Sequence, residues 1–111
     1  MAIYRLFSGD DGESHFEEMD ITAHPALENI EALKGIFLRK HVSDFQDFHP
    51  APDKRWLAVI SGAIRMEMGD GTSGRFGPGA ILRITDTTGR GHKSWWEDDP
   101  VYAVMPLPDD A

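Results

Sequence analysis

The last two-thirds of the sequence consists of short apolar runs separated by turns that are rich in glycine and proline. Residues 55–61 form a nearly continuous apolar run, as in a strand that is buried on both faces. In residues 64–68 apolar and charged side chains alternate strictly, as in a strand with one buried face. Further strands are expected at 80–85, 92–97 and 101–105. Such evenly spaced short strands predict an all-β sandwich or barrel.

The turn residues support this prediction. A Gly-Asp-Gly at 69–71 lies between two strand-like runs, which is a strong hairpin signal. Phe76-Gly77-Pro78-Gly79 predicts a second turn, because proline restricts one dihedral angle and glycine tolerates positive φ. Residues 86–91 form a loop before the strand expected at 92–97.

The N-terminal third is less regular. Strands are expected at 2–7 and 14–20, and another at 36–42. Residues 26–34 carry apolar side chains at helical spacing, and Gly35 is well placed as a C-cap. This pattern predicts one short helix.

Length and charge limit the function classes. A chain of 111 residues has room for one domain, expected over 1–111. The net charge of −8, with scattered basic residues, argues against nucleic acid and anionic membranes as partners. The sequence has no run of about 20 apolar residues that would span a bilayer, and its first residues are too polar for a secretory signal. Cysteine is absent, so thiol chemistry is excluded and a cytoplasmic protein is expected.

Two motifs resemble those of the cupin superfamily. The first is His49-Pro50-Ala51-Pro52, which leads into a strand closed by Gly62; the second is Gly77-Pro78-Gly79, followed by a strand and Thr87-Thr88-Gly89-Arg90-Gly91-His92. The chain is also similar to a set of short bacterial cupins that share these stretches. The resemblance covers about residues 48–106 and implies the cupin double-stranded β-helix, a jelly-roll barrel. Residues 1–47 would then supply N-terminal strands and a connecting segment, and small cupins commonly form homodimers.

The resemblance also implies where a metal would bind. The three His and one Glu of a metal-binding cupin fall on His49, Ala51, Arg55 and His92. Two imidazoles rarely hold a divalent cation alone, and the Arg55 guanidinium would repel one. We therefore expect no cofactor. The alternative is a divalent metal (Fe, Mn, Ni or Zn) on His49 and His92, with a third ligand from His15, His24, His41 or Asp53.

His92 and His49 are the candidate catalytic residues, as general acid or base. In an alternating strand, His92 shares one face with Ser94 and Trp96, a combination that indicates a pocket. The alternative is a buried histidine bonded to a backbone carbonyl. For His49, the alternative is a loop histidine without a chemical role.

Arg55, Ser94, Trp96 and Met66 are the candidate substrate-binding residues. An inward-facing Arg55 would select a small anion such as a carboxylate, whereas at the start of a strand it would extend to solvent. Met66 is most simply a core residue. Asp86 either orients His92 or caps the turn before Thr87, and we favour the cap.

Three functions follow from these residues. The first is a metal-independent enzyme that carries out isomerisation, dehydration or lyase chemistry on a small anion. The second is a metal-dependent cupin, of isomerase or dioxygenase type, with a non-standard ligand set. The third is a non-catalytic module that binds or senses a small molecule in the same pocket. The residues alone do not decide whether the chain is an enzyme.

Overall fold

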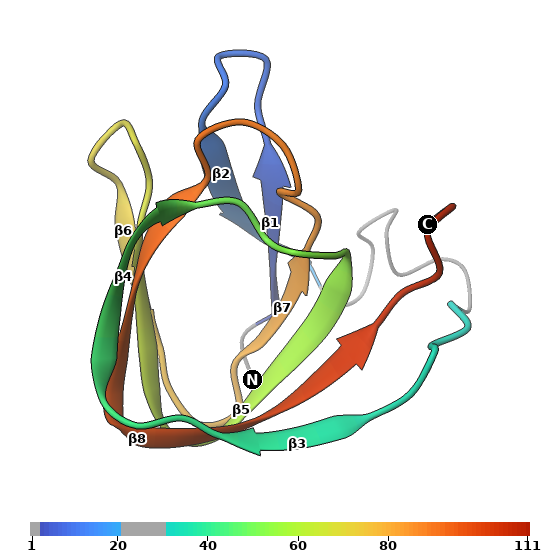
Figure 1. The fold of residues 1–111 in the computed structure, drawn as a ribbon, viewed down its shortest axis with the longest axis vertical. Helices are drawn as coiled ribbons and strands as arrows, with labels where there is room; N and C mark the ends of the chain where they lie inside the picture. The colour runs from blue at the N-terminus through green and yellow to red at the C-terminus, as the bar shows by residue number, and fades with distance from the viewer. Residues whose placement is uncertain (1–2, 21–30) are drawn as a thin grey trace.

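The computed structural model describes residues 3–20 and 31–111, and strands are the regular elements in these ranges (Figure 1). They are β1 (Ile3–Ser8), β2 (Ser14–Glu18), β3 (Phe37–Lys40), β4 (Asp44–His49), β5 (Arg55–Glu67), β6 (Ser73–Phe76), β7 (Ile81–Ile84) and β8 (His92–Pro106). The all-β class is confirmed. The short helix expected over 26–34 falls mostly on residues outside the described ranges, and residues 31–34 are not helical. Among the described residues, none belongs to a helix with the length and apolarity that crossing a membrane requires.

Two long strands form the centre of the fold. β5 and β8 pair antiparallel along their lengths, from Arg55 opposite Pro106 to Glu67 opposite Lys93. The sequence predicted each of them as two separate strands. Gly62 does not end β5 but bends it, with φ of 68° and register shifts around Ser61. A Cβ at Gly62 would lie 2.7 Å from the Cα of Pro100, so only glycine fits where the two bends meet.

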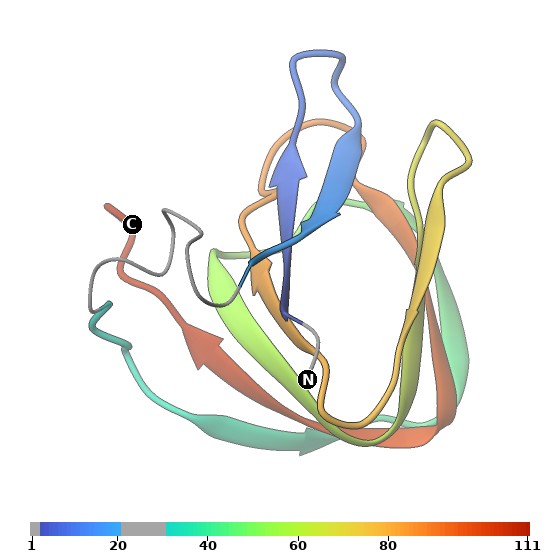
Figure 2. The same ribbon diagram turned by 180° about the vertical axis from the view of Figure 1, so that it is seen from behind.

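The bends divide the sheet into two sections that share β5 and β8. In one section the first half of β5 pairs with β7 and the second half of β8 pairs with β3. β7 continues to β1, in a parallel pair, and then to β2. In the other section β6 pairs with the second half of β5, and β4 pairs with the first half of β8. The sheet curls so that β4 and β6 lie across from β7 and β1 (Figures 1 and 2).

The curled sheet is not a closed barrel. β2 and β3 are the two ends of the strand order β2-β1-β7-β5-β8-β3, and they do not pair with each other. The described strands therefore form an open, strongly bent mixed sheet, which is consistent with a β-sandwich. β3 is an exposed edge strand, in which all four side chains are accessible. The cupin arrangement of these strands stays a prediction.

Apolar side chains of the inner faces pack between the two sections. The core includes Leu6, Val59, Ile64 and Leu82, each at most 3% exposed, which come from β1, β5 and β7. Beside them the rings of Tyr4, Phe16 and Phe76 pack edge to face. The core does not fill the space near β4 and the start of β8, where a pocket remains.

Candidate functional site

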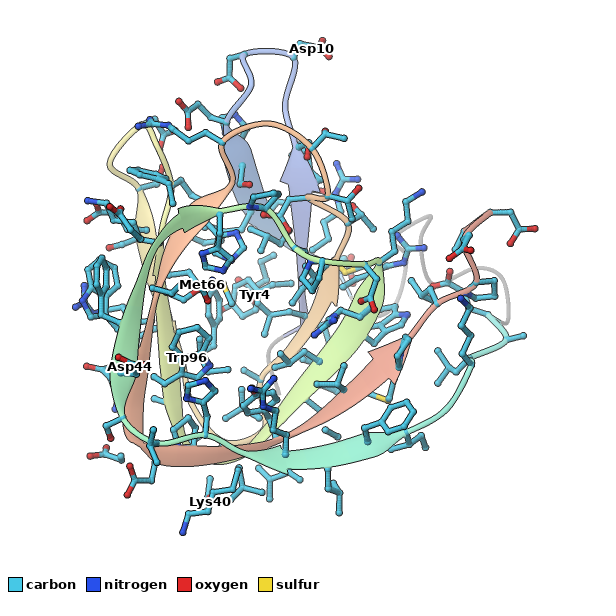
Figure 3. All side chains as sticks on the ribbon, in the orientation of Figure 1. Tyr4, Asp10, Lys40, Asp44, Met66 and Trp96 are labelled. Carbon is cyan, nitrogen blue, oxygen red and sulfur yellow. The ribbon has the colours of Figure 1, made fainter. Side chains whose placement is uncertain are left out.

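A pocket of about 270 Å³ lies on the inner face of the sheet. Its walls contain all six residues named from the sequence as catalytic or substrate-binding: His49, Arg55, Met66, His92, Ser94 and Trp96. In Figure 3, Met66 and Trp96 point into the space that the strands enclose, whereas Lys40 and Asp44 point away from it. The pocket is completed by Arg39, Gln46, Pro50, Ala51, Pro52, Leu57, Ile64, Ile84 and Tyr102.

A buried carboxylate holds His92 in position. Asp86 lies after β7 and is 0% exposed, and His92, the first residue of β8, is 4% exposed. The Nδ1 of His92 lies 2.5 Å from Oδ2 of Asp86. The hydroxyl of Ser14, also fully buried, donates to the same oxygen over 2.6 Å. The expectation that the Asp86 side chain caps its turn is thus wrong, because its bonds go to His92 and Ser14.

The loop between β7 and β8 contacts the end of β4 on one side and the β1–β2 hairpin on the other. Gly91 has φ of 82°, and a Cβ there would lie 1.8 Å from the carbonyl oxygen of His49, so the loop passes directly against the end of β4. On the other side Arg90 forms an ion pair with Glu13 of the β1–β2 hairpin, at 2.7 Å. These contacts set where β8 begins and therefore where the His92 ring lies.

His49 reaches the pocket through an irregularity in β4. The register of β4 against β8 shifts between Gln46 and His49, which places His49 opposite His92, with ring centroids 4.7 Å apart. Its Nδ1 donates to the carbonyl oxygen of Asp47 over 2.7 Å. We assign the proton to Nδ1 because a carbonyl oxygen only accepts. Burial, together with repulsion from His92, lowers the pKa of His49, although the Asp47 hydrogen bond opposes this.

Both imidazoles therefore present the same nitrogen to the pocket. With Nδ1 bonded to Asp86 in His92 and to the backbone in His49, Nε2 is the ring nitrogen left without a hydrogen bond to the described residues. A neutral imidazole held in this tautomer carries a lone pair on Nε2. The arrangement can accept a proton from a bound molecule or return one to it.

Arg55 lies in the pocket wall with a side chain that is 19% exposed. Its Nε donates to Oδ1 of Asp53 over 2.6 Å, so it is neither an isolated cation nor extended into solvent. The bond to Nε orients the guanidinium and leaves its two terminal nitrogens, with four N–H groups, for a ligand. Asp53, itself half-exposed, neutralises part of the charge.

Arg39 is a second arginine in the pocket wall, and the sequence analysis did not identify it. It lies on β3 opposite Tyr102 of β8, and Tyr102 also lines the pocket. Its side chain is exposed and forms no ion pair with the described residues. β3 has only four residues and carries apolar side chains on both faces. Its alternation pattern therefore does not reveal which face points to the pocket, and Arg39 is not recognisable as a pocket residue from the sequence.

The remaining predicted residues form the polar and apolar walls. Ser94 is 1% exposed and Met66 4%, and Met66 also belongs to the hydrophobic core. The indole of Trp96 is stacked by His41, at 4.3 Å between centroids and 9° between planes. Ala51 is buried, and its N–H donates to the carbonyl oxygen of Asp86, which fixes the first motif against the second.

The side chains do not fit a standard three-His, one-Glu metal centre. Ala51 and Arg55 supply no ligand. Of the proposed third ligands, His15 bonds to Asp11, His41 stacks on Trp96 and Asp53 pairs with Arg55; His24 lies outside the described residues. Within residues 3–20 and 31–111, no group of three or more His, Asp or Glu side chains is arranged to hold a metal ion.

The side chains that line the pocket are basic or uncharged, although the chain as a whole is acidic. The sequence has 19 acidic and 11 basic residues, yet the fifteen residues that line the pocket include two arginines, two histidines and no carboxylate. Asp53 and Asp86 do not line the pocket, but they bond to Arg55 and His92 and offset part of the positive charge. The free N–H groups of the two arginines remain available to bind an anion.

Fold and site together define an all-β protein with a cationic pocket and a buried imidazole–carboxylate pair in its wall. No protein-family model matches the sequence, and no curated protein is significantly similar to it.

Proposed function

We propose that the chain is a small cupin that binds a small carboxylate-type anion in this pocket and acts on it with His92 as general acid or base. Two cupin-type motifs support the family, since they supply His49, Ala51 and His92 to one pocket. The chemistry is proposed to be independent of a metal, because Ala51 and Arg55 occupy two of the four ligand positions.

The hydrogen bond between His92 and Asp86 carries this proposal. A buried carboxylate on Nδ1 fixes the tautomer and the orientation of the ring. It also stabilises the imidazolium that forms when Nε2 takes up a proton. A histidine that only filled the core would need one acceptor, and a backbone carbonyl would satisfy it. Here a fully buried aspartate bonds to the ring, and Ser14 donates a second hydrogen bond to that aspartate.

Arg55 and His49 complete the proposed site. The free edge of the Arg55 guanidinium binds a carboxylate of the substrate and thereby places the adjacent carbon near His92. The lowered pKa of His49 keeps its imidazole neutral at neutral pH, so that its Nε2 serves as a second proton acceptor. Proton transfer beside a bound carboxylate is the step shared by isomerases, dehydratases and lyases.

Solvent deuterium exchange tests this step without knowledge of the product. Small 2-oxo and 3-hydroxy acids are incubated with the protein in D₂O, and loss of carbon-bound proton signals is followed by NMR. We expect protein-dependent exchange or conversion of at least one acid, reduced at least about 100-fold in His92→Gln. His15→Gln is the matched control, since His15 lies on the β1–β2 hairpin and does not line the pocket.

Two outcomes would overturn the proposal. Binding of acids without exchange or turnover of any of them would favour a non-catalytic binding module. Stoichiometric metal in elemental analysis of the untagged protein, lost in His92→Gln, would favour a metal-dependent cupin with an unusual ligand set.

A further inference from the structure

Two arginines enter the pocket from different strands. Arg55 is the first residue of β5, and Arg39 lies on β3. Both strands pair with β8, one along each of its edges. Arg55 has its Nε occupied by Asp53, whereas Arg39 forms no ion pair with any described residue. Arg39 lines the pocket with its guanidinium unpaired among these residues, so its N–H groups are available to an anion that enters the pocket.

The two arginines lie at well-separated positions in the sheet. Arg39 is paired with Tyr102 of β8 and Arg55 with Pro106, four residues further along that strand. The two backbone positions are therefore about 13 Å apart along β8 and about 10 Å apart across it. Since the two side chains start from backbone positions this far apart and both line the pocket, a ligand with two acidic groups can engage both of them at once.

We infer that the ligand of this pocket is a short dicarboxylate, with one acid group on Arg55 beside His92 and the other on Arg39 at the exposed edge. This inference rests on the proposed function, in which the pocket binds a carboxylate-type anion. A pocket of about 270 Å³ has room for a molecule of this size, and among the described residues no carboxylate lines it.

The rest of the wall fits such a molecule. Leu57, Ile64 and Ile84 offer apolar surface for a short carbon chain between the acid groups. His49 and His92 would lie along this chain, and Gln46 and Ser94 add further hydrogen-bonding groups. The inner acid group is held by a partly buried arginine and the outer one by an exposed arginine. The outer contact is therefore the weaker of the two and the more sensitive to salt.

Binding of matched acids tests the inference directly. Succinate and glutarate are compared with butyrate and pentanoate, which have the same numbers of carbons but one acid group, by calorimetric titration at low and high salt. We expect each dicarboxylate to bind about tenfold more tightly than its partner at low salt, and this preference to shrink at high salt. Arg39→Gln should weaken dicarboxylate binding alone, and Arg55→Gln should weaken binding of both classes.

Lys40→Gln is the matched control for Arg39→Gln. Lys40 is the next residue on β3, is also exposed, and points away from the pocket (Figure 3). The variant removes the same charge from the same strand, so it should leave the dicarboxylate preference unchanged. An equal effect of the two variants would mean that net charge alone is responsible, and the inference would be wrong.

The outcomes separate this inference from the proposed function. If butyrate and succinate bind equally well and both depend on Arg55, the anion pocket stands and the second acid group is refuted. If neither class of acid binds to the wild-type protein at millimolar concentration, the inference and the proposed function both fail. A dicarboxylate preference that is lost only in Arg39→Gln supports both.

Discussion

Replacing Asp86 by alanine removes the acceptor shared by His92 and Ser14. Both donors lie within 2.6 Å of Oδ2, and all three residues are almost fully buried. A buried donor left without an acceptor costs about 1–3 kcal/mol. With two such donors, we expect Asp86→Ala to lower the free energy of unfolding by about 2–6 kcal/mol.

Two smaller substitutions separate the contributions to this loss of stability. Asp86→Asn keeps an acceptor for both donors but places an amide NH₂ where Oδ1 lies, and Oδ1 has no hydrogen-bond partner among the described residues. The two unpaired N–H groups should cost about 1–3 kcal/mol. Ser14→Ala leaves the bond between Asp86 and His92 intact and should cost about 1 kcal/mol.

Urea denaturation followed by tryptophan fluorescence measures these differences. Asp10→Asn is the control for the loss of a negative charge, because Asp10 is exposed at the tip of the β1–β2 hairpin (Figure 3), and it should change stability by less than about 0.5 kcal/mol. A cost below about 1 kcal/mol for Asp86→Ala would mean that Asp86 does not hold the His92 ring, and would refute the reasoning.

Three further predictions concern backbone, pH and assembly. Gly91→Ala places a Cβ 1.8 Å from the His49 carbonyl oxygen at a φ of 82°, so it should cost more than about 3 kcal/mol in the same denaturation assay; a nearly wild-type stability would contradict the described loop. Since burial lowers the pKa of His49, the unfolded chain takes up this proton first as the pH falls, and the contribution of His49 to stability should decrease below about pH 6.5. His49→Gln should reduce that decrease, and an NMR titration that puts the His49 pKa at or above 6.5 would disprove it. The homodimer implied by the family resemblance stays a prediction, for which light scattering should give twice the 12.4 kDa chain mass; a constant monomer mass would exclude it.

Side-chain alternation accounts for most of what the sequence predicted about the site. Because neighbouring residues of a strand face opposite sides, the sequence alone predicts that His92, Ser94 and Trp96 share one face. The structure places all three in the wall of one pocket. The two cupin-type motifs predict that His49 and Arg55 belong to this pocket as well.

The features that sequence reasoning missed depend on contacts between distant residues. The strand at 44–49 is polar and mostly exposed, so it lacks an apolar pattern, and it is recognisable only by its pairing with β8. The role of Asp86 depends on Ser14, 72 residues earlier in the chain. An aspartate before Thr-Thr-Gly caps a turn more often than it orients a histidine, so local reasoning favoured the wrong alternative.

We propose that a small acid binds in the pocket with its carboxylate on Arg55 and its carbon chain beside Nε2 of His92. Long-range ¹H–¹⁵N NMR of the histidine rings tests it most directly, with glutarate as the titrant. We predict that free His92 shows a protonated Nδ1, that glutarate shifts the Nε2 resonances of His92 and His49, and that Arg55→Gln abolishes these shifts. Glutarate binding that leaves both rings unchanged, or His92 rings protonated on Nε2 alone, would contradict the account.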